Sequence, residues 1–575
     1  MPKLLQINIT ANWGSTGKIA EQIGVLAQAQ GWECYMAYGR AHNPSALQCF
    51  RVGSDLEVKG HYLLSRFLDA EGDGSWRATR QLIKKIDEIK PDVIHLHNIH
   101  GHYLNYAMLV GHINKRGIPV VWTLHDAWII TGHCYLFGGT GCEKWKQECH
   151  QCPMAGKYSL DRSRQNFRKK KQVFTSLRQV ELVTVSDWLK NVIGESYMSG
   201  FPRRTVYNGI DLSIFHPRET DWKKRLGVEG KYMVMAVATA WTESKGLSDY
   251  CRLAEILPEA YQIVLVGMTQ SQIRQLPKRI IGIERTQSQA ELVELYSSAD
   301  VVVSLSKGES FGLTPVEGMA CGTPAVVYDN AALPELIGAD TGEVVSAGDV
   351  DSVAKAIERI CTMSESQRDR VKECCLQRAR KYYDKEKNYS EYISTYNKLI
   401  ISKIWGGKIV LGAATAWDKR KGFDDYLKLA SMLPPSYLIM LVGLTEEMLA
   451  QLPGNMIGMG KTKSQDELAA LYAMADVVTS LSVSESMGMT PVEGFACGTP
   501  AIVYDNTAQP ELVTPETGLV VKTGDVESVR WAVLGICEKG KHHYSKACRE
   551  RAEDFFSKNY NFQRYIELYN DILAR

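Results

Sequence analysis

One stretch of sequence occurs twice in this chain. Residues 299–330 read ADVVVSLSKGESFGLTPVEGMACGTPAVVYDN, and residues 475–506 read ADVVTSLSVSESMGMTPVEGFACGTPAIVYDN. Roughly half of the residues in the 90 positions that end at Asn330 recur unchanged at the same spacing. Solenoid units run to roughly 20–50 residues, and this period is much longer. The repeat therefore indicates a duplicated domain.

Each copy has the pattern of a strand, a loop, a short helix and a second strand. The apolar runs at 301–303 and 325–328 are typical of buried strands. Between them we expect a helix with Thr314 as N-cap and Pro315 at the first helical position, ending at Cys321. Thr314-x-x-Glu317 also has the form of a capping box. Helix N-termini bind anions, so the stretch predicts a ligand site.

Strands and helices alternate along the rest of the chain, as they do in α/β proteins with parallel sheets. A turn-rich segment at 206–217 is the best candidate for a hinge. We expect strands at 4–9, 92–97, 120–125, 180–186, 232–238 and 263–266, and helices at 19–30, 163–177, 290–296, 389–400 and 562–573. The pattern predicts Rossmann-like domains at 1–205, 206–402 and 403–575, the third duplicating the second.

The composition is that of a soluble globular protein, with 45% hydrophobic and 23% charged residues. A net charge of +2 gives no field that would recruit nucleic acid. The N-terminus reads as a first strand and not as a signal peptide. Because no window approaches 18 uninterrupted apolar residues, we expect a cytoplasmic protein without a transmembrane helix.

Most of the 14 cysteines are scattered and read as small buried residues in a reducing compartment. Cys134, Cys142, Cys149 and Cys152 are the exception, with the spacing C-x7-C-x6-C-x2-C. A structural zinc site fits this spacing. Two disulfides, or four unliganded core cysteines, are the alternatives.

Three further features leave alternatives open. The turn that contains Gly14 and Gly17 is either a tight strand-to-helix connection or a cradle of backbone amides for a diphosphate or a sugar. Histidines at 95, 97, 100 and 102 fit the lining of a cleft at a strand end better than a metal site. The basic, partly apolar segment 163–177 is either an amphipathic helix on an anionic membrane surface or a solvated helix with its apolar side packed inward.

Taken together, these residues resemble the retaining glycosyltransferases of family 4, which have the two-domain GT-B fold. The resemblance covers residues 1–400 well and treats 401–575 as an extra donor-type half. It rests on the E-x7-E pair Glu309 and Glu317, on Lys245-Gly246, on N-G-I-D-x3-F-x-P at 208–217, on G-S-T-G at 14–17 and on His125. The W-x3-K-G pattern and the four cysteines look like the subgroup that builds bacterial exopolysaccharides, of the colanic-acid transferase kind.

The resemblance implies a hexosyltransferase-type enzyme that moves a sugar, with retention, from a UDP- or GDP-sugar to a lipid-linked saccharide acceptor. No catalytic metal is expected, and the enzyme would work peripherally on the inner face of the plasma membrane. Lys245 would bind the diphosphate, Glu309 the donor sugar and Glu317 the ribose hydroxyls. His125 would touch the sugar from the acceptor side. Further donor contacts are expected from Gly14, Gly17, Gly312, Leu313 and Thr314.

One departure concerns the cation that assists Lys245. Many family members have an Arg five or six residues earlier, where this chain has Ala240 and Thr239. The second copy keeps the corresponding residues Lys421, Glu485 and Glu493 and adds Arg420. It has no N-G-I-D junction, so we expect 206–400 to catalyse and 401–575 to bind a nucleotide without turnover. A GT-B epimerase or phosphorylase and a nucleotide-sugar-binding scaffold are the alternative functions.

Overall fold

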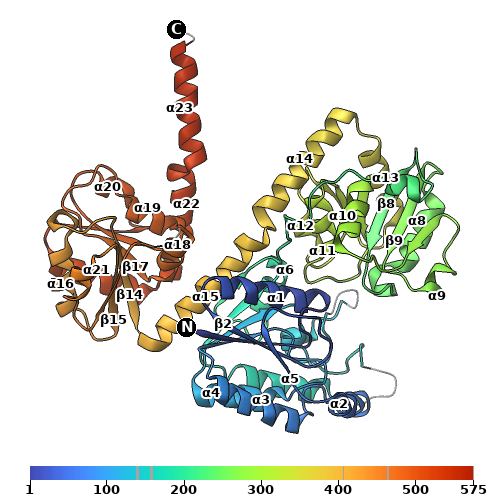
Figure 1. The fold of residues 1–575 in the computed structure, drawn as a ribbon, viewed down its shortest axis with the longest axis horizontal. Coiled ribbons are helices and arrows are strands. Elements are labelled where there is room, and N and C mark those ends of the chain that lie inside the picture. Colours follow the sequence, from blue (N-terminus) through green and yellow to red (C-terminus); the bar gives the residue numbers. More distant parts are fainter. Residues whose placement is uncertain (137–140, 156–159, 406, 463–464, 574–575) are drawn as a thin grey trace. The chain divides into compact units, whose positions relative to one another are not determined.

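The computed structural model describes residues 1–136, 141–155, 160–405, 407–462 and 465–573 (Figure 1). It forms two compact units, residues 1–392 and 393–575. The described residues contain three wholly parallel sheets, two in the first unit and one in the second. The α/β class and the Rossmann-like form of all three are therefore confirmed. No helix in the described part of the chain has the length and apolar character needed to cross a bilayer.

The first sheet has seven strands in the order β3-β2-β1-β4-β5-β6-β7. The strands are β1 (Lys3–Asn8), β2 (Glu33–Tyr38), β3 (Gln48–Arg51), β4 (Val93–Leu96), β5 (Val120–Leu124), β6 (Val180–Thr184) and β7 (Arg203–Thr205). The helices are α1 (Gly14–Ala29), α2 (Asp55–Leu68), α3 (Trp76–Ile89), α4 (Tyr106–Arg116), α5 (Ser163–Phe174) and α6 (Asp187–Gly194). The strand order reverses between β1 and β4, and ligands bind in the crevice at such a switch point.

The second sheet has the order β10-β9-β8-β11-β12-β13 and reverses between β8 and β11. Its strands are β8 (Tyr232–Val237), β9 (Tyr261–Val266), β10 (Ile280–Ile283), β11 (Val301–Ser304), β12 (Ala325–Asp329) and β13 (Gly342–Ser346). The helices around it are α7 (Trp222–Arg225), α8 (Leu247–Ile256), α9 (Gln270–Ile273), α10 (Gln289–Ser298), α11 (Leu313–Ala320), α12 (Leu333–Leu336), α13 (Val350–Cys361) and α14 (Glu365–Tyr382). Helix α15 (Lys385–Trp405) follows and runs from the first unit into the second.

The third sheet repeats the second, with the order β16-β15-β14-β17-β18-β19. Its strands are β14 (Lys408–Ala413), β15 (Tyr437–Val442), β16 (Met456–Met459), β17 (Val477–Ser480), β18 (Ala501–Tyr504) and β19 (Gly518–Val521). The helices are α16 (Phe423–Met432), α17 (Glu446–Leu449), α18 (Gln465–Met474), α19 (Met489–Ala496), α20 (Gln509–Leu512), α21 (Val526–Lys539), α22 (Ser545–Phe556) and α23 (Lys558–Leu573). Val410 pairs with Val477 as Val234 pairs with Val301, so even the strand register is duplicated.

The predicted start of the short helix in the repeated stretch is wrong. Helix α11 begins at Leu313, with Gly312 as its N-cap, so Thr314 lies inside the first turn and Pro315 is the third helical residue. Gly312 has a φ of 103°, a conformation that side chains disfavour and glycine permits. The chain therefore turns into the helix two residues earlier than the Thr-Pro pattern suggests. No capping box forms, because the Thr314 hydroxyl donates to the Val237 carbonyl at 3.2 Å instead.

Candidate functional site

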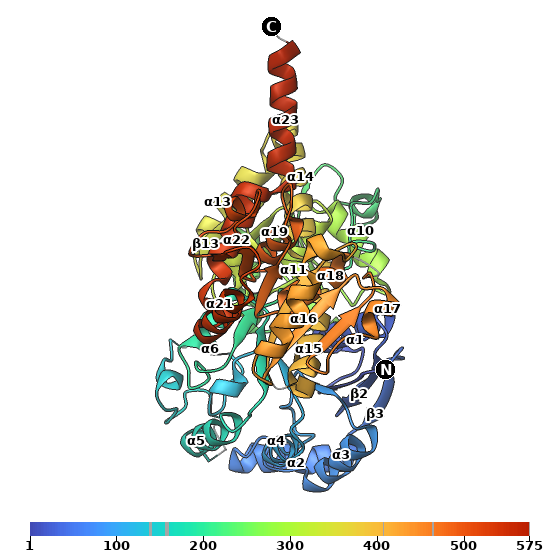
Figure 2. The ribbon, with the colours of Figure 1, turned by 90° about the vertical axis from the view of Figure 1, so that its left-hand side faces the viewer.

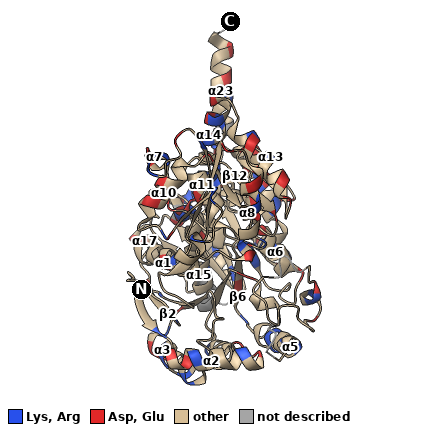
Figure 3. Ribbon diagram, turned by 90° about the vertical axis from the view of Figure 1, so that its right-hand side faces the viewer, with Lys and Arg blue, Asp and Glu red and all other residues tan. Residues whose placement is uncertain are grey.

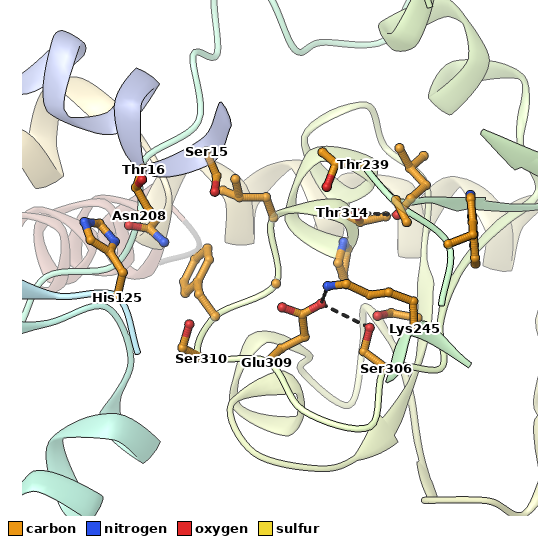
Figure 4. Close-up of a pocket in the computed structure, with 18 of the residues that line it drawn as sticks. Ser15, Thr16, His125, Asn208, Thr239, Lys245, Ser306, Glu309, Ser310 and Thr314 are labelled. Carbon is orange, nitrogen blue, oxygen red and sulfur yellow. Dashed lines mark hydrogen bonds and ion pairs between the residues drawn. The ribbon is translucent and has the colours of Figure 1, made fainter. Parts of the chain in front are cut away.

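A cavity of about 200 Å³ lies at the carboxyl ends of the strands of the first two sheets (Figure 4). Both sheets contribute to it, so neither forms this site alone. Among the residues that line it are Ser15, Thr16, His125, Asn208, Thr239, Lys245, Ser306, Glu309, Ser310, Gly312, Leu313 and Thr314. Of the nine residues predicted to carry the site, six line this cavity: His125, Lys245, Glu309, Gly312, Leu313 and Thr314.

Lys245 and Glu309 form an ion pair inside the cavity (Figure 4). Lys245 lies at the end of a short 3-10 turn before α8, and Glu309 lies in the loop between β11 and α11. The Ser306 hydroxyl also donates to Glu309, at 3.0 Å. The lysine and the carboxylate are each about a quarter to a third exposed, so a ligand in the cavity can reach both.

The first turn of α11 opens onto the same cavity. No side chain caps it within the described residues, and the turn carries no acidic residue. Its backbone N–H groups and the positive end of the helix dipole are therefore available to an anion. Lys245 and the start of α11 together make a positively polarised end of the cavity.

Glu317 lies one turn further along α11 and is not among the residues that line the cavity. Its carboxylate accepts a hydrogen bond from the Tyr296 hydroxyl at 2.8 Å. Burial raises the pKa of Glu317, while the Tyr296 hydrogen bond and the charge of Lys18 act in the opposite direction. Lys18 belongs to α1, so residues that follow the first sheet's β1 face this carboxylate.

His125 is held by a chain of buried side chains. The Gln6 amide donates to the Ala20 carbonyl at 2.8 Å, which turns its oxygen towards His97 Nε2 at 3.0 Å. His97 Nδ1 in turn lies 3.1 Å from His125 Nε2. With Nε2–H of His97 donating to Gln6, its Nδ1 accepts from Nε2–H of His125. Burial lowers the pKa of His125 to about 4, so the ring is neutral and presents Nδ1 as an acceptor.

Gly14 and Gly17 shape the site without lining it. Gly14 has a φ of 67° at the start of α1. A Cβ on Gly17 would lie 2.7 Å from the Thr10 hydroxyl, so glycine lets α1 approach the end of β1. The residues of this turn that reach the cavity are Ser15 and Thr16.

The second copy reproduces these side-chain contacts of the first. Lys421 pairs with Glu485, and the Tyr472 hydroxyl donates to Glu493 at 2.8 Å. The Thr490 hydroxyl donates to the Ala413 carbonyl at 3.0 Å, as Thr314 does to Val237. The added Arg420 forms an ion pair with Asp418 at 2.8 Å. The duplicated sequence therefore forms a duplicated half-site.

The cysteine cluster does not form a metal centre in the described part of the chain. There, no three His, Cys, Asp or Glu side chains are placed to hold a common ion, which applies also to the four histidines near β4. Cys149 accepts the Gly132 N–H at 3.3 Å. All four are free thiols, so the zinc interpretation finds no support here.

The basic segment 163–177 forms α5 and packs inward. Phe167 and Phe174 are buried, and the buried Lys170 donates to the carbonyls of Trp128 and Thr131. Three of the basic residues on the helix form ion pairs: Arg164 and Arg168 with Glu148, and Lys169 with Asp73. Figure 3 shows the Lys and Arg positions of the ribbon in blue, including those on α5. Paired and buried side chains favour the solvated helix over the membrane-bound one.

Sequence reasoning missed several residues that the fold brings to the site. Tyr296 acts through Glu317, 21 positions away, and Gln6 acts on His125 through His97, 91 positions away. His97 was predicted to line a cleft, but its contact with His125, 28 positions away, was not predicted. Ser306 comes three residues before Glu309, so its position in the same loop was a usable signal. Asn208 was identified as part of the hinge and of the N-G-I-D motif, and it also lines the cavity.

A fold of paired Rossmann-like sheets with a cavity at their facing strand ends defines the class of GT-B proteins. Comparison with known families agrees. The model described as "Glycosyl transferases group 1" matches residues 218–374 and again 401–555. The model described as "Glycosyltransferase Family 4" matches residues 20–214. The chain belongs to the group 1 glycosyl transferases, and it contains the family's characteristic domain twice.

Similar individual proteins include the putative colanic acid biosynthesis glycosyl transferase WcaC of Escherichia coli. It is 23% identical over an alignment of 435 positions that covers 69% of this chain and all of that protein. The N-acetyl-alpha-D-glucosaminyl L-malate synthase of Bacillus anthracis is 30% identical over 38% of this chain and 60% of its own length.

Solved structures share the fold. Sucrose-phosphate synthase from Thermosynechococcus elongatus matches 70% of this chain and all of its own, with a TM-score of 0.53 and 16% identity. Anabaena HepE, solved in complex with UDP and glucose, matches 69% of this chain and all of its own, with a TM-score of 0.50 and 14% identity. These likenesses confirm the GT-B architecture, and the family assignment makes the chain a glycosyltransferase.

Proposed function

We propose that residues 1–400 transfer a sugar, with retention, from a UDP- or GDP-sugar to a lipid-linked saccharide acceptor in bacterial surface polysaccharide synthesis. The observation that carries the proposal is the Lys245–Glu309 pair beside the uncapped start of α11, in a cavity that His125 closes from the first sheet. The similarity to WcaC supports the polysaccharide class of product. No step requires a metal ion that these residues would have to hold.

In this proposal the diphosphate of the donor binds Lys245 and replaces Glu309 as its ion-pair partner. The lysine and the N–H groups of α11 then stabilise the charge that develops on the leaving diphosphate. Glu309, released from its ion pair, accepts from hydroxyls of the donor sugar. Nδ1 of His125 accepts from another sugar hydroxyl, and the chain through His97 and Gln6 holds that nitrogen unprotonated.

The reaction breaks the bond between the anomeric carbon and the diphosphate oxygen, which leaves with the electron pair. The acceptor hydroxyl forms its new bond on the same face of the sugar and gives its proton to the departing oxygen. Glu317 fixes the donor by accepting from the ribose hydroxyls, and Tyr296 orients the Glu317 carboxylate at 2.8 Å. Proximity and electrostatic stabilisation then account for catalysis.

A second cavity, of about 230 Å³, is the acceptor site in this proposal. It lies among the helices and loops of the first sheet and is lined by Tyr62, Trp128, Tyr135, Glu71 and Lys170, among others. Aromatic faces beside charged groups suit a saccharide. Ser65 and His102 also line it, and the Ser65 hydroxyl and His102 Nδ1 are buried without a hydrogen-bond partner in the described structure. An acceptor hydroxyl would supply those partners.

The two cavities are linked through one loop. His125 lines the first, and Trp128, three residues later, lines the second. The double variant Ser65→Ala/His102→Ala should raise the KM for the acceptor and leave slow donor hydrolysis unchanged. A change in donor hydrolysis with an unchanged acceptor KM would contradict the acceptor assignment.

The proposed function as a whole is tested with a panel of nucleotide sugars. A ligand at about 100 times its Kd stabilises a protein by about 2.7 kcal/mol, which a thermal-shift assay detects. We expect one UDP- or GDP-sugar to stabilise the full chain, and its turnover to require a saccharide acceptor. No stabilisation by any nucleotide sugar would refute the proposal. Binding without turnover for every acceptor would favour the scaffold alternative.

Residues 401–575 are proposed to fold as a donor-type domain that binds a nucleotide without turning it over in this chain alone. The conserved contacts of Lys421, Glu485 and Glu493 support nucleotide binding. Catalysis further needs a domain on the acceptor side, and the proposed acceptor-side domain, residues 1–205, already shares its cavity with the first copy.

A further inference from the structure

The two donor-type copies end in corresponding helices. Residues 392–397 read YISTYN and residues 565–570 read YIELYN, so α15 and α23 align. The contacts just before these helices correspond as well. Cys375 Sγ donates to the Thr341 carbonyl at 3.7 Å, and Cys548 Sγ donates to the Thr517 carbonyl at 3.8 Å. This alignment pairs Tyr389 with Phe562, Tyr392 with Tyr565, Ile393 with Ile566 and Tyr396 with Tyr569.

In α15 this apolar face is covered. Tyr389, Tyr392, Ile393 and Tyr396 are each at most 2% exposed. The Tyr389 hydroxyl accepts the Gly209 N–H at 3.0 Å. The Tyr392 hydroxyl accepts from Thr123 of β5 at 3.1 Å, and its ring lies 5.2 Å from that of His95 on β4. The first sheet is thus the surface that the start of α15 requires.

In α23 the corresponding face is exposed. Phe562, Tyr565, Ile566 and Tyr569 are between 51% and 58% exposed. Figures 1 and 2 show α23 extending away from the sheet of its own unit. A contiguous apolar face of this kind marks an interaction surface. Helix α23 retains the apolar residues that form this face in α15. The surface that covers the face of α15 is therefore the best guide to the partner of α23.

One charge distinguishes the two helices. Glu391 of α15 forms an ion pair with Arg204 of β7 at 3.1 Å. Its counterpart on α23 is Arg564, so the charge is reversed. Residues 1–205 of this chain, or of a second copy, therefore offer Arg564 no equivalent of the Glu391–Arg204 ion pair. The position there is moreover already filled by α15.

We propose that the apolar face of α23 docks onto a GT-B acceptor-side domain carried by a different polypeptide. Docking places an acceptor side over the half-site of Lys421, Glu485 and Glu493 and completes a second transferase cleft. This goes beyond the proposed function, which concerns only the first copy. It is independent of which sugar either cleft uses.

The test is site-specific photocrosslinking of the full chain in the organism that encodes it, with p-benzoylphenylalanine at Tyr565. We expect a crosslinked peptide from another protein, within a GT-B N-terminal domain, near the ends of the strands equivalent to β4 and β5. The same probe at Asp571 is the matched control, because the counterpart of Asp571 is the exposed Lys398. It should give at most a tenth of that yield.

Crosslinks to residues 1–205 of this chain, to a second copy or to lipid would overturn the proposal, as would the absence of any crosslink at Tyr565. The variant Ile566→Glu tests the apolar face. It places a charge within that face and should lower the yield with the partner at least fivefold. An unchanged yield would refute docking through this face.

Discussion

Acid should destabilise the first sheet through one buried histidine. His61 on α2 is 3% exposed, and its Nε2 accepts the N–H groups of Gly72 and Gly74, both at 3.1 Å. Nδ1 lies 2.9 Å from the Ser75 hydroxyl, to which it donates. The fold thus uses the neutral ring, and burial, aided by the charge of His102, lowers the pKa of His61 to about 4.

The size of the effect follows from linkage. An unfolded histidine has a pKa of about 6.5, so the unfolded chain binds the proton first as the pH falls. The stabilisation is fully present above a pH of about 6.5 and is lost as the pH falls towards about 4. Between pH 7 and pH 5 this one group should lower the free energy of unfolding by about 2 kcal/mol.

The variant His61→Gln isolates this contribution, because glutamine keeps an acceptor oxygen and does not titrate. It should be less stable than the wild type at pH 7, and the difference should shrink by about 2 kcal/mol at pH 5. Urea titrations of both proteins, followed by hydrogen exchange in peptides from residues 55–89, measure it. A difference that stays constant between pH 7 and pH 5 would refute the reasoning.

Three further outcomes are expected. Lys245→Gln should lower the rate of sugar transfer by about 100-fold, because it removes one preorganised contact to the leaving group. Lys421→Gln should change that rate by less than about threefold. Equal effects would contradict the assignment of the active cleft to the first copy. Gln6→Leu removes the acceptor that fixes the tautomer of His97. It should lower kcat by about tenfold, with little change in nucleotide affinity measured by calorimetry. A normal kcat would count against the role of the Gln6–His97–His125 contacts. Glu335 of α12 accepts the N–H groups of Asp187 and Trp188 at 3.0 and 2.9 Å. Glu335→Ala should therefore speed hydrogen exchange at the start of α6. Unchanged exchange would show that this contact does not hold the two sides of the cavity together.

The fold could be predicted because its signals are local. Apolar runs such as 301–303 form central strands, and the duplicated stretch forms two sheets of the same order. Helix ends were less predictable. Thr314 and Pro315 have the right types for a helix start, yet Gly312 takes the cap because only its left-handed conformation admits the tight turn.

The candidate site was predictable in its residues but not in its contacts. Glu309 and Lys245 were identified from separate motifs, and their ion pair joins positions 64 residues apart. His125 was found from the resemblance, whereas the partners that set its protonation come from other strands. Such contacts depend on the order of the strands in the sheet, and the hydrophobic periodicity of the sequence does not determine that order. For the cysteines, spacing alone suggested a metal site, and the described part of that segment contains no three side chains placed to hold a common ion.

The central claim is that the first donor copy, and not the second, catalyses transfer in this chain. Glu317 and Glu493 occupy equivalent positions and accept from equivalent tyrosines, both at 2.8 Å. The most direct measurement therefore compares Glu317→Ala with Glu493→Ala in the full chain, by the rate of sugar transfer from the nucleotide donor identified in the panel. The account predicts that Glu317→Ala abolishes transfer and that Glu493→Ala leaves most of it. The reverse result would contradict it and assign the active cleft to the second copy.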